Sequence, residues 1–398
     1  MTSQNRRLTM KDNQAKYPQL RFKGFTDPWE ERKLGELNDV RDGTHDSPKY
    51  VVNGHPFVTS KNLSDQGLDL SDVSYISDED FAAFNKRSKV DVGDILFGMI
   101  GTIGHPVLVE SDSFAIKNVA LIKGGGKISN CYLLQLLKSP VFDRYVKREN
   151  AGGTQKFLGL NLVRDFVLRV PNDDEQRKIG TFFTYLDNLI AVNQRKLAKL
   201  KELKQGYLQK LFPENGSKFP QLRFAGFADA WEERKLGDIT KISTGKLDAN
   251  AMVENGKYDF YTSGIKKYRI DVAAFEGPSI TIAGNGATVG YMHLADNKFN
   301  AYQRTYVLQE FLVDRSFIFS EIGNKLPKKI KQEARTGNIP YIVMDMLTEL
   351  KLSIPQNNSE QQKIGSFFKQ LDDTIDLHQR KLEKLQELKK GYLQKMFC

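Results

Sequence analysis

The sequence predicts a mixed α+β fold, in which two similar α/β modules are each followed by one long helix. Three observations predict it. A short segment occurs twice, at the start of each module. A longer segment with helical spacing also occurs twice, after each module. Between these repeats lie short β-type runs, turn signals and a few helices, a pattern typical of a mixed module.

The first repeat opens each module. Residues 17–36 and 219–238 are identical at 15 of 20 positions, at an offset of 202. Solenoid repeats have periods of only about 20–45 residues. The long period therefore indicates a duplication of one module-plus-helix unit.

The second repeat closes each module. Residues 176–212 and 361–397 match at 24 of 37 positions, at an offset of 185, which makes the first module 17 residues longer than the second. Apolar residues recur at steps of three and four, the spacing of a coiled-coil seam. We expect each copy to form a helix roughly 54 Å long and to use the other copy as its partner.

The predicted seam is mostly apolar, with one polar residue in the middle of each copy. Either Asn193 and His378 are buried and fix the register of the pair, or the seam is open to water there. The stripe includes Leu203 and Leu388 and runs on to Leu211 and Met396. The other predicted seam residues are Ile179, Leu186, Leu197 and Leu200 in the first copy, and Ile364, Leu371, Leu382 and Leu385 in the second.

Four glycines interrupt the helical pattern. Gly180, Gly206, Gly365 and Gly391 would each cost about 1 kcal/mol relative to alanine inside a helix. Either they allow another element to approach closely, or the helices end before Gly206 and Gly391.

Between the repeats the two modules have diverged, but a few short segments still correspond in sequence. Gly43 corresponds to Gly245, and Thr59–Ser60 corresponds to Thr262–Ser263 after a slip of one residue. The modules are therefore expected to share one fold with different surfaces. β-Type runs are predicted at residues 90–101, 118–124, 279–284 and 306–311, and a helix at 131–149.

Composition favours a polyanionic partner and argues against several other classes. The formal net charge is +10, which is typical of nucleic-acid-binding proteins but also of merely basic ones. Cys131 and Cys398 are far apart and lack nearby ligands, so we expect neither a zinc site nor a disulfide framework. No signal peptide or membrane span is predicted, and this fits a cytoplasmic protein.

The sequence contains no recognisable catalytic constellation. A phosphate-binding loop of the P-loop type is absent, and the five histidines are scattered. Asp173, Asp174 and Glu175 form an acidic run that a nuclease could use. The same run is favoured at a helix N-terminus, which is the preferred interpretation. No catalytic or metal-binding residue is therefore predicted.

Polar and basic loop residues are the candidate DNA contacts. Such side chains donate hydrogen bonds to bases and phosphates. Each loop alone is more often simply solvated, but their recurrence in both modules favours function. The candidates are Thr44, His45, Thr59, Ser60, Lys61, Asn62, Thr154, Gln155 and Lys156 in the first module, and Lys246, Thr262, Ser263, Lys266, Lys267, Arg269, Arg335 and Asn338 in the second.

The order of parts resembles the specificity subunit of type I restriction–modification enzymes, and the likeness covers nearly the whole chain. The motifs that carry it are Trp-Glu-x-Arg-Lys-Leu-Gly at 29–35 and 231–237, Glu-Gln at the helix starts (175–176 and 360–361), Leu-Asp at 186–187 and 371–372, and Gln-Arg-Lys-Leu at 194–197 and 379–382.

This resemblance implies two target-recognition domains, at residues 17–171 and 215–354, with spacer helices at 172–214 and 355–398. The polar composition of residues 1–16 separately predicts a flexible tail. Each domain would bind one half of a split double-stranded DNA site. The partners would be two modification (methyltransferase) subunits and motor–nuclease restriction subunits. S-adenosylmethionine, ATP and magnesium are expected on those partners, and no cofactor on this chain.

A pseudo-twofold relation between the halves would make the helices antiparallel, which suits two separated half-sites better than a parallel pair. The alternative is a coiled-coil scaffold that does not bind DNA and whose modules bind proteins.

Overall fold

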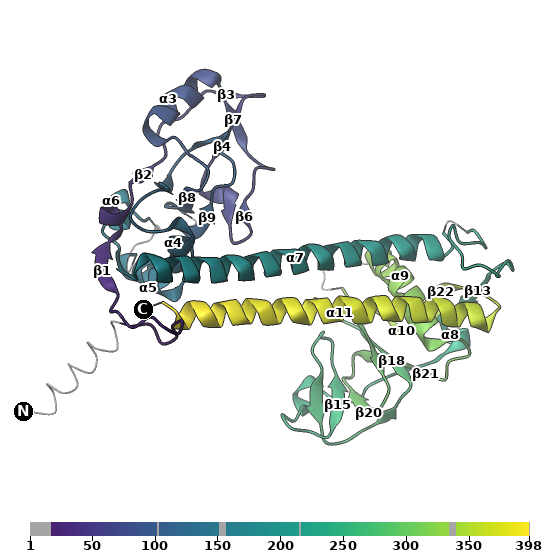
Figure 1. Cartoon of the computed structure of the whole chain (residues 1–398). Coiled ribbons are helices and arrows are strands. Elements are labelled where there is room, and N and C mark those ends of the chain that lie inside the picture. The colour runs from purple at the N-terminus through teal and green to yellow at the C-terminus, as the bar shows by residue number, and fades with distance from the viewer. Residues whose placement is uncertain (1–16, 102, 151–156, 215, 334–339, 398) are drawn as a thin grey trace, which may run out of the picture. The chain divides into compact units, whose positions relative to one another are not determined.

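The computed structural model describes residues 17–101, 103–150, 157–214, 216–333 and 340–397 (Figure 1). They form two compact units. Unit 1 comprises the chain up to Asn193 and from Lys381 onward, and unit 2 runs from Gln194 to Arg380. Each unit contains one α/β module and one half of each long helix.

The first module is built on two four-stranded sheets. The central sheet is antiparallel in the order β2-β11-β8-β9, with β2 at Val40–Asp42, β11 at Val119–Ile122, β8 at Ile95–Gly98 and β9 at Gly104–Leu108. The outer sheet has the order β10-β4-β7-β3, and only β10 and β4 run parallel. Its strands are β10 (Ala115–Ile116), β4 (His55–Val58), β7 (Ser74–Ile76) and β3 (Tyr50–Val51).

Smaller elements complete the first module. Strand β1 (Glu30–Lys33) pairs antiparallel with β12 (Val167–Val170), and β5 (Leu63–Ser64) pairs with β6 (Gly67–Leu68). The helices are α2 (Leu34–Leu37), η1 (Ser60–Asn62), α3 (Asp78–Ser88), α4 (Asn130–Leu137), α5 (Pro140–Glu149) and α6 (Leu160–Arg164).

The second module repeats the central sheet, but its outer sheet carries the fourth strand on the opposite edge, beside β20 and not beside the strand equivalent to β7. Its central sheet has the order β14-β21-β18-β19, and its outer sheet the order β16-β15-β20-β17 with β15 and β20 parallel. The strands are β13 (Glu232–Lys235), β14 (Lys241–Thr244), β15 (Tyr258–Tyr261), β16 (Tyr268–Ile270), β17 (Phe275–Glu276), β18 (Ser279–Ala283), β19 (Met292–Ala295), β20 (Lys298–Ala301), β21 (Thr305–Gln309) and β22 (Lys351–Ile354). Its helices are α8 (Leu236–Ile239), η2 (Ala249–Ala251), α9 (Arg315–Glu333) and α10 (Met344–Thr348).

The predicted helix at 131–149 is two helices. Ser139 caps α5 by accepting a hydrogen bond from the N–H of Val141, and Pro140 occupies the first turn. Proline has no N–H to continue the preceding helix, so α4 ends and α5 starts in a new direction. In the second module the corresponding segment stays one helix, α9, although Pro327 lies inside it.

Each long helix starts inside the core of its own unit. Phe183 of α7 (Asp173–Leu211) and Phe368 of α11 (Asn358–Lys395) are completely buried. Phe183 stacks on Phe397 in unit 1, and Phe368 stacks on Phe212 in unit 2. The core of each unit therefore joins a module to the start of one helix and the end of the other.

The long helices pair in antiparallel orientation, as predicted. In unit 1, Phe182 of α7 packs edge-on against Tyr392 of α11, with ring centroids 4.9 Å apart. In unit 2 the roles are exchanged: Phe367 of α11 packs against Tyr207 of α7, also at 4.9 Å. The beginning of each helix thus contacts the end of the other.

Most of the predicted seam is buried or half-buried. Leu203 and Leu388 are exceptions, with 48% and 46% of their surface exposed, so their assignment to the seam was wrong. The next residue in each helix, Lys204 or Lys389, turns toward the partner and forms an ion pair with Asp372 or Asp187. The buried seam residues are Ile179, Leu186, Asn193, Leu197, Ile364 and Leu382, and the half-buried ones are Leu200, Leu371, His378 and Leu385.

Asn193 is buried, so the seam is closed to water at this position. Its side-chain N–H donates to the carbonyl oxygen of Leu189 at 2.7 Å, one turn earlier on the same helix. The amide is thus satisfied within α7.

The glycines of the long helices fall into two classes. A Cβ on Gly365 would lie 2.6 Å from the main-chain nitrogen of Phe317, and a Cβ on Gly180 would lie 3.0 Å from Cβ of Cys131. Gly365 and Gly180 therefore allow α9 and α4 of the modules to pack closely against the long helices. Gly206 and Gly391 face open space, and both helices continue through them.

Candidate DNA interface

In each module a close backbone contact brings two loops together at the end of the central sheet. Gly43 follows β2, and a Cβ on it would lie 2.4 Å from the carbonyl oxygen of Ile116. Gly245 follows β14, and a Cβ there would lie 2.0 Å from the carbonyl oxygen of Ala301. Only glycine permits these contacts. The loop after the first strand of the sheet therefore lies beside the loop that leads into β11 or β21.

In the first module this place holds a hydrogen-bonded cluster. His45 Nδ1 lies 2.6 Å from Asn118 Oδ1, and His45 Nε2 lies 3.0 Å from Asp42 Oδ2. Arg87, from the last turn of α3, forms an ion pair with the other oxygen of Asp42. The Asp42 carboxylate is buried, whereas more than half of the His45 and Arg87 side chains is exposed. A buried acid thus holds two exposed, nitrogen-rich side chains in place.

Other first-module candidates support the loop structure. Thr59 and Asn62 form a capping box around η1, and the Asn62 amide also donates to two main-chain carbonyls. Ser60 and Thr44 are buried, whereas Lys61 is exposed. That these residues contact DNA stays a prediction, in which Lys61 and His45 are the members with accessible side chains.

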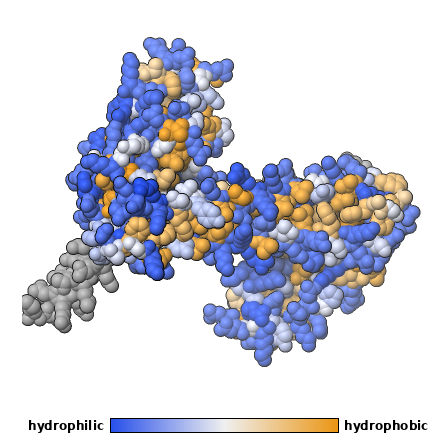
Figure 2. All heavy atoms as spheres, in the orientation of Figure 1, coloured by the Kyte–Doolittle hydropathy of each residue, from blue (hydrophilic) through white to orange (hydrophobic). Residues whose placement is uncertain are grey.

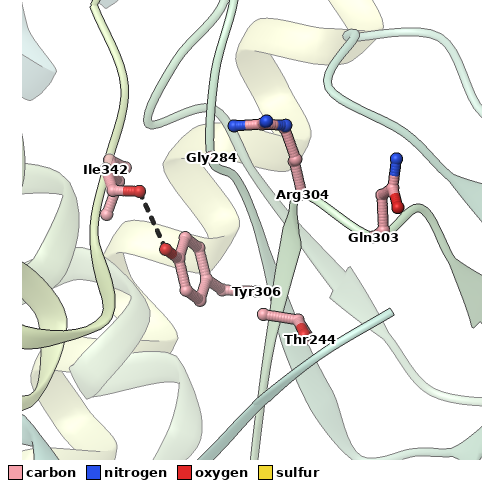
Figure 3. Close-up of a pocket in the computed structure, with 6 residues that line it drawn as sticks. All are labelled: Thr244, Gly284, Gln303, Arg304, Tyr306 and Ile342. Carbon is pink, nitrogen blue, oxygen red and sulfur yellow. Dashed lines mark hydrogen bonds between the residues drawn. The ribbon is translucent and has the colours of Figure 1, made fainter. Parts of the chain in front are cut away.

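In the second module the same place holds a pocket of about 350 Å³ (Figure 3). Thr244, Gly284, Gln303, Arg304, Tyr306 and Ile342 line it. The Tyr306 hydroxyl donates to the carbonyl oxygen of Ile342 at 2.8 Å and closes one wall. Gln303 and Arg304 are exposed.

The second-module candidates differ in how free their side chains are. Lys246 is exposed, and the ammonium groups of Lys266 and Lys267 lie 5.4 Å from the ring centres of Tyr268 and Tyr261. Arg269 binds the carboxylate of Asp259 and two main-chain carbonyls, which makes it a brace of the β15–β16 hairpin.

The two hydroxyl candidates of this module, Thr262 and Ser263, are half-buried at the end of β15. Ser263 donates to Asn285 Oδ1, and its carbonyl accepts from the Thr288 hydroxyl. The remaining candidates, Thr154, Gln155, Lys156, Arg335 and Asn338, lie outside the described residues.

The acidic run at the start of α7 has a structural task. Glu175 is completely buried and accepts two hydrogen bonds from Arg21, each 2.7 Å long, and one from the indole of Trp29. This bonding raises the pKa of the Arg21 guanidinium. In unit 2, Glu360 and Arg223 form the same pair. Across the described ranges, no group of three or more His, Cys, Asp or Glu residues is placed to hold a metal ion.

Comparison with known proteins decides the family. The family model described as "Type I restriction modification DNA specificity domain" matches residues 26–202 and again residues 228–387, which together are more than half of the chain. The chain belongs to this family. It is a specificity subunit of a type I restriction–modification system and carries two specificity domains, which contain the two modules described above.

Individual relatives agree with this assignment. The EcoDI specificity subunit of Escherichia coli is 34% identical over 164 residues, which cover 41% of this chain and 36% of that protein. A putative MjaX specificity subunit of Methanocaldococcus jannaschii is 24% identical and matches over 91% of both chains. The crystal structure of a Mycoplasma genitalium S subunit has the same fold, with a TM-score of 0.72 at 17% identity over 96% of this chain and 99% of that one.

Sequence patterns missed several residues at this place in the specificity domains. Asp42, Arg87, Asn118, Gln303 and Arg304 were not among the candidates. The sequence held a signal for two of them, because Gln303 and Arg304 form a polar pair one residue before the predicted strand at 306–311. Arg87 has no such signal, since only the fold brings the end of α3 to Asp42.

No helix within the described ranges combines the length and the apolar character that crossing a membrane requires.

Proposed function

We propose that this specificity subunit recognises a two-part site on double-stranded DNA and catalyses no reaction itself. Each specificity domain contacts one half-site. The proposal rests on one observation: the two domains share a backbone framework but carry different exposed side chains on it. Equivalent central sheets and glycine contacts carry His45 and Arg87 beside them in one domain, and Gln303 and Arg304 in the other. Equivalent frameworks favour the same docking geometry, and different side chains favour different bases.

The long helices are proposed as the spacer that sets the gap between the half-sites. Helix α7 has 39 residues and α11 has 38. Each therefore rises about 57 Å along its axis, more than one turn of B-form DNA at about 34 Å. The net charge of +10 supports binding to the phosphate backbone.

Adenine methylation and DNA cleavage are proposed to lie with partner subunits: two modification (methyltransferase) subunits and motor–nuclease restriction subunits. These partners would bind S-adenosylmethionine, ATP and magnesium. Apolar residues along the long helices offer docking surfaces (Figure 2). Val192 and Leu388 are exposed in unit 1, and their repeat equivalents Leu377 and Leu203 are exposed in unit 2. Two equivalent apolar surfaces suit two copies of one partner.

The test is the methylation pattern that this chain directs. The chain is expressed with its modification subunits in cells that lack other adenine methylation, and methylated adenines are mapped across the genome. We expect one motif with two specified half-sites separated by a gap of fixed length. The control is the modification subunits without this chain, which should leave no motif.

Two results would contradict the proposal. A complex that shows no sequence-selective DNA binding at moderate salt would contradict the proposal and favour a scaffold whose modules bind proteins. Metal-dependent cutting of DNA by the isolated chain would contradict a non-catalytic role.

A further inference from the structure

At two neighbouring positions that surround the pocket of the second specificity domain, a large and a small residue have changed places relative to the first domain. Gly284 and Tyr306 occupy the places that Met99 and Ala120 occupy in the first domain. The register of the central sheets gives this equivalence, as do matching hydrogen bonds from Ile342 to Gly284 and from Leu158 to Met99. A Cβ on Gly284 would lie 2.9 Å from the Tyr306 ring and 2.3 Å from the carbonyl oxygen of Arg304. Residue 284 must therefore lack a side chain, and the space beside Tyr306 stays open.

Arg304 lies at the mouth of this pocket and has no acidic partner within the described part of the chain. Three other arginines of this domain do have one: Arg223 pairs with Glu360, Arg269 with Asp259 and Arg315 with Asp296. The lining contains no carboxylate, and its other polar side chains are those of Thr244, Gln303 and Tyr306. The guanidinium donors of Arg304 thus remain available to a ligand.

The backbone that carries Arg304 is held rigidly. The carbonyl of Arg304 accepts from Gly284 N–H at 2.8 Å, and Gln303 N–H donates to Leu247 at 2.8 Å. The loop closes with a hydrogen bond from Thr305 N–H to Tyr302, also 2.8 Å long. A side chain on such a fixed loop can discriminate between closely similar ligands, because binding does not first require the loop to become ordered.

We infer that Arg304 recognises a guanine in the half-site bound by the second specificity domain, with Gln303 beside it at the neighbouring base pair. This inference rests on the proposed function. Arginine offers two parallel N–H donors, and guanine presents its O6 and N7 acceptors side by side in the major groove. Glutamine can match the edge of adenine in the same way.

The first domain differs at the equivalent loop. Between β10 and β11 the loop contains only Lys117 and Asn118, whereas Tyr302, Gln303 and Arg304 connect β20 to β21. Asn118 is held by His45, and Met99 takes the place of Gly284. A guanine contact of this kind is therefore specific to the second half-site.

The test compares Arg304→Ala and Arg304→Gln with the wild-type chain, each in complex with the modification subunits. We expect one guanine of one half-site to become degenerate in the mapped motif, while the other half-site and the gap stay unchanged. Discrimination at that position should fall roughly five- to 150-fold, the effect of losing one bidentate base contact. Arg234→Ala is the matched control, because Arg234 is an exposed arginine on β13 of the same domain, and it should leave the motif unchanged.

Two outcomes overturn the inference. In the first, the motif is unchanged, DNA affinity falls equally at all sites, and about one fewer ion is released on binding. Arg304 would then be a phosphate contact. An unchanged motif with unchanged affinity would remove Arg304 from the interface. Failure of the proposed function is distinguishable, because the wild-type complex would then produce no two-part motif. Arg304 is exposed, so both variants should melt at the wild-type temperature.

Discussion

Buried arginine–glutamate pairs connect the repeated segment that opens each module (residues 17–36 and 219–238) to the start of a long helix. The side chains of Glu175 and Glu360 are 0% and 1% exposed, and each is held by one arginine through two hydrogen bonds. Removal of one partner from a buried pair leaves a charge without compensation. These pairs explain why Arg21 and Arg223 fall within the repeated segment, far from their partners in sequence.

We predict that Arg21→Met lowers the free energy of unfolding by about 3–5 kcal/mol, measured by urea denaturation of the full chain. The double variant Arg21→Met/Glu175→Gln should recover part of this loss, since no buried charge then remains. Equal losses in the single and double variants would contradict this account.

A second residue-scale prediction concerns Glu321 on α9. Burial raises the pKa of this carboxyl to about 7, although Lys325 and the hydrogen bond from Ser353 N–H oppose the shift. The unfolded chain releases this proton near pH 4.5. Between these values the unfolded state binds fewer protons than the native state, so stability falls as pH rises from about 4.5 to 7 and then levels off.

Glu321→Gln removes this titration. We expect the variant to be more stable than wild type by about 3 kcal/mol at pH 8 and nearly equal to it at pH 4.5. Urea denaturation at several pH values measures the difference. Parallel pH profiles for the two proteins would exclude the predicted role of Glu321.

At the scale of elements, the repeated helix shows what spacing can and cannot predict. Steps of three and four predicted the helices and their pairing, and the pseudo-twofold relation between the halves predicted the antiparallel orientation. The same spacing pattern wrongly included Leu203 and Leu388, because at that point the next residues, Lys204 and Lys389, face the partner helix and pair with its aspartates. Spacing also missed the burial of Phe183 and Phe368, which depends on the module that packs against the other face.

The helix glycines give a matched set of variants. Gly206→Ala and Gly391→Ala should each stabilise the chain by up to about 1 kcal/mol, since both positions face open space. Gly365→Ala should destabilise it, because the new Cβ would lie 2.6 Å from a main-chain nitrogen of α9. Thermal melts of the four proteins provide the measurement, and a stabilised Gly365→Ala variant would contradict the predicted close approach.

At the scale of the whole molecule, the duplicated units make the two half-sites separable. Exchanging residues 17–171 for the corresponding domain of another family member should change one half of the methylated motif and leave the other half intact. A change in both halves would contradict one domain per half-site. The readout is the genome-wide methylation pattern used above.

The gap between half-sites should depend on the helices alone. Insertion of seven residues after Asn193 in α7 and of seven after His378 in α11 lengthens both helices by two turns, about 10.5 Å. We expect a gap longer by about three base pairs at about 3.4 Å each, with unchanged half-sites. An unchanged gap would mean that the helices do not act as the spacer.

The duplication, the mixed modules, the paired helices and the likeness to specificity subunits could all be predicted from the amino-acid sequence. These follow from local periodicity and from repeated segments, which a single chain displays directly. The tertiary structure decided which polar residues face outward. Asn62 and Arg269 looked like free donors in the sequence, but the fold commits them to caps and hairpin braces. The sequence alone does not distinguish Arg304 from other polar loop residues, whereas in the fold Gly284 and Tyr306 line a pocket beside it. Exposure and pairing depend on contacts between distant segments, and no local pattern encodes them.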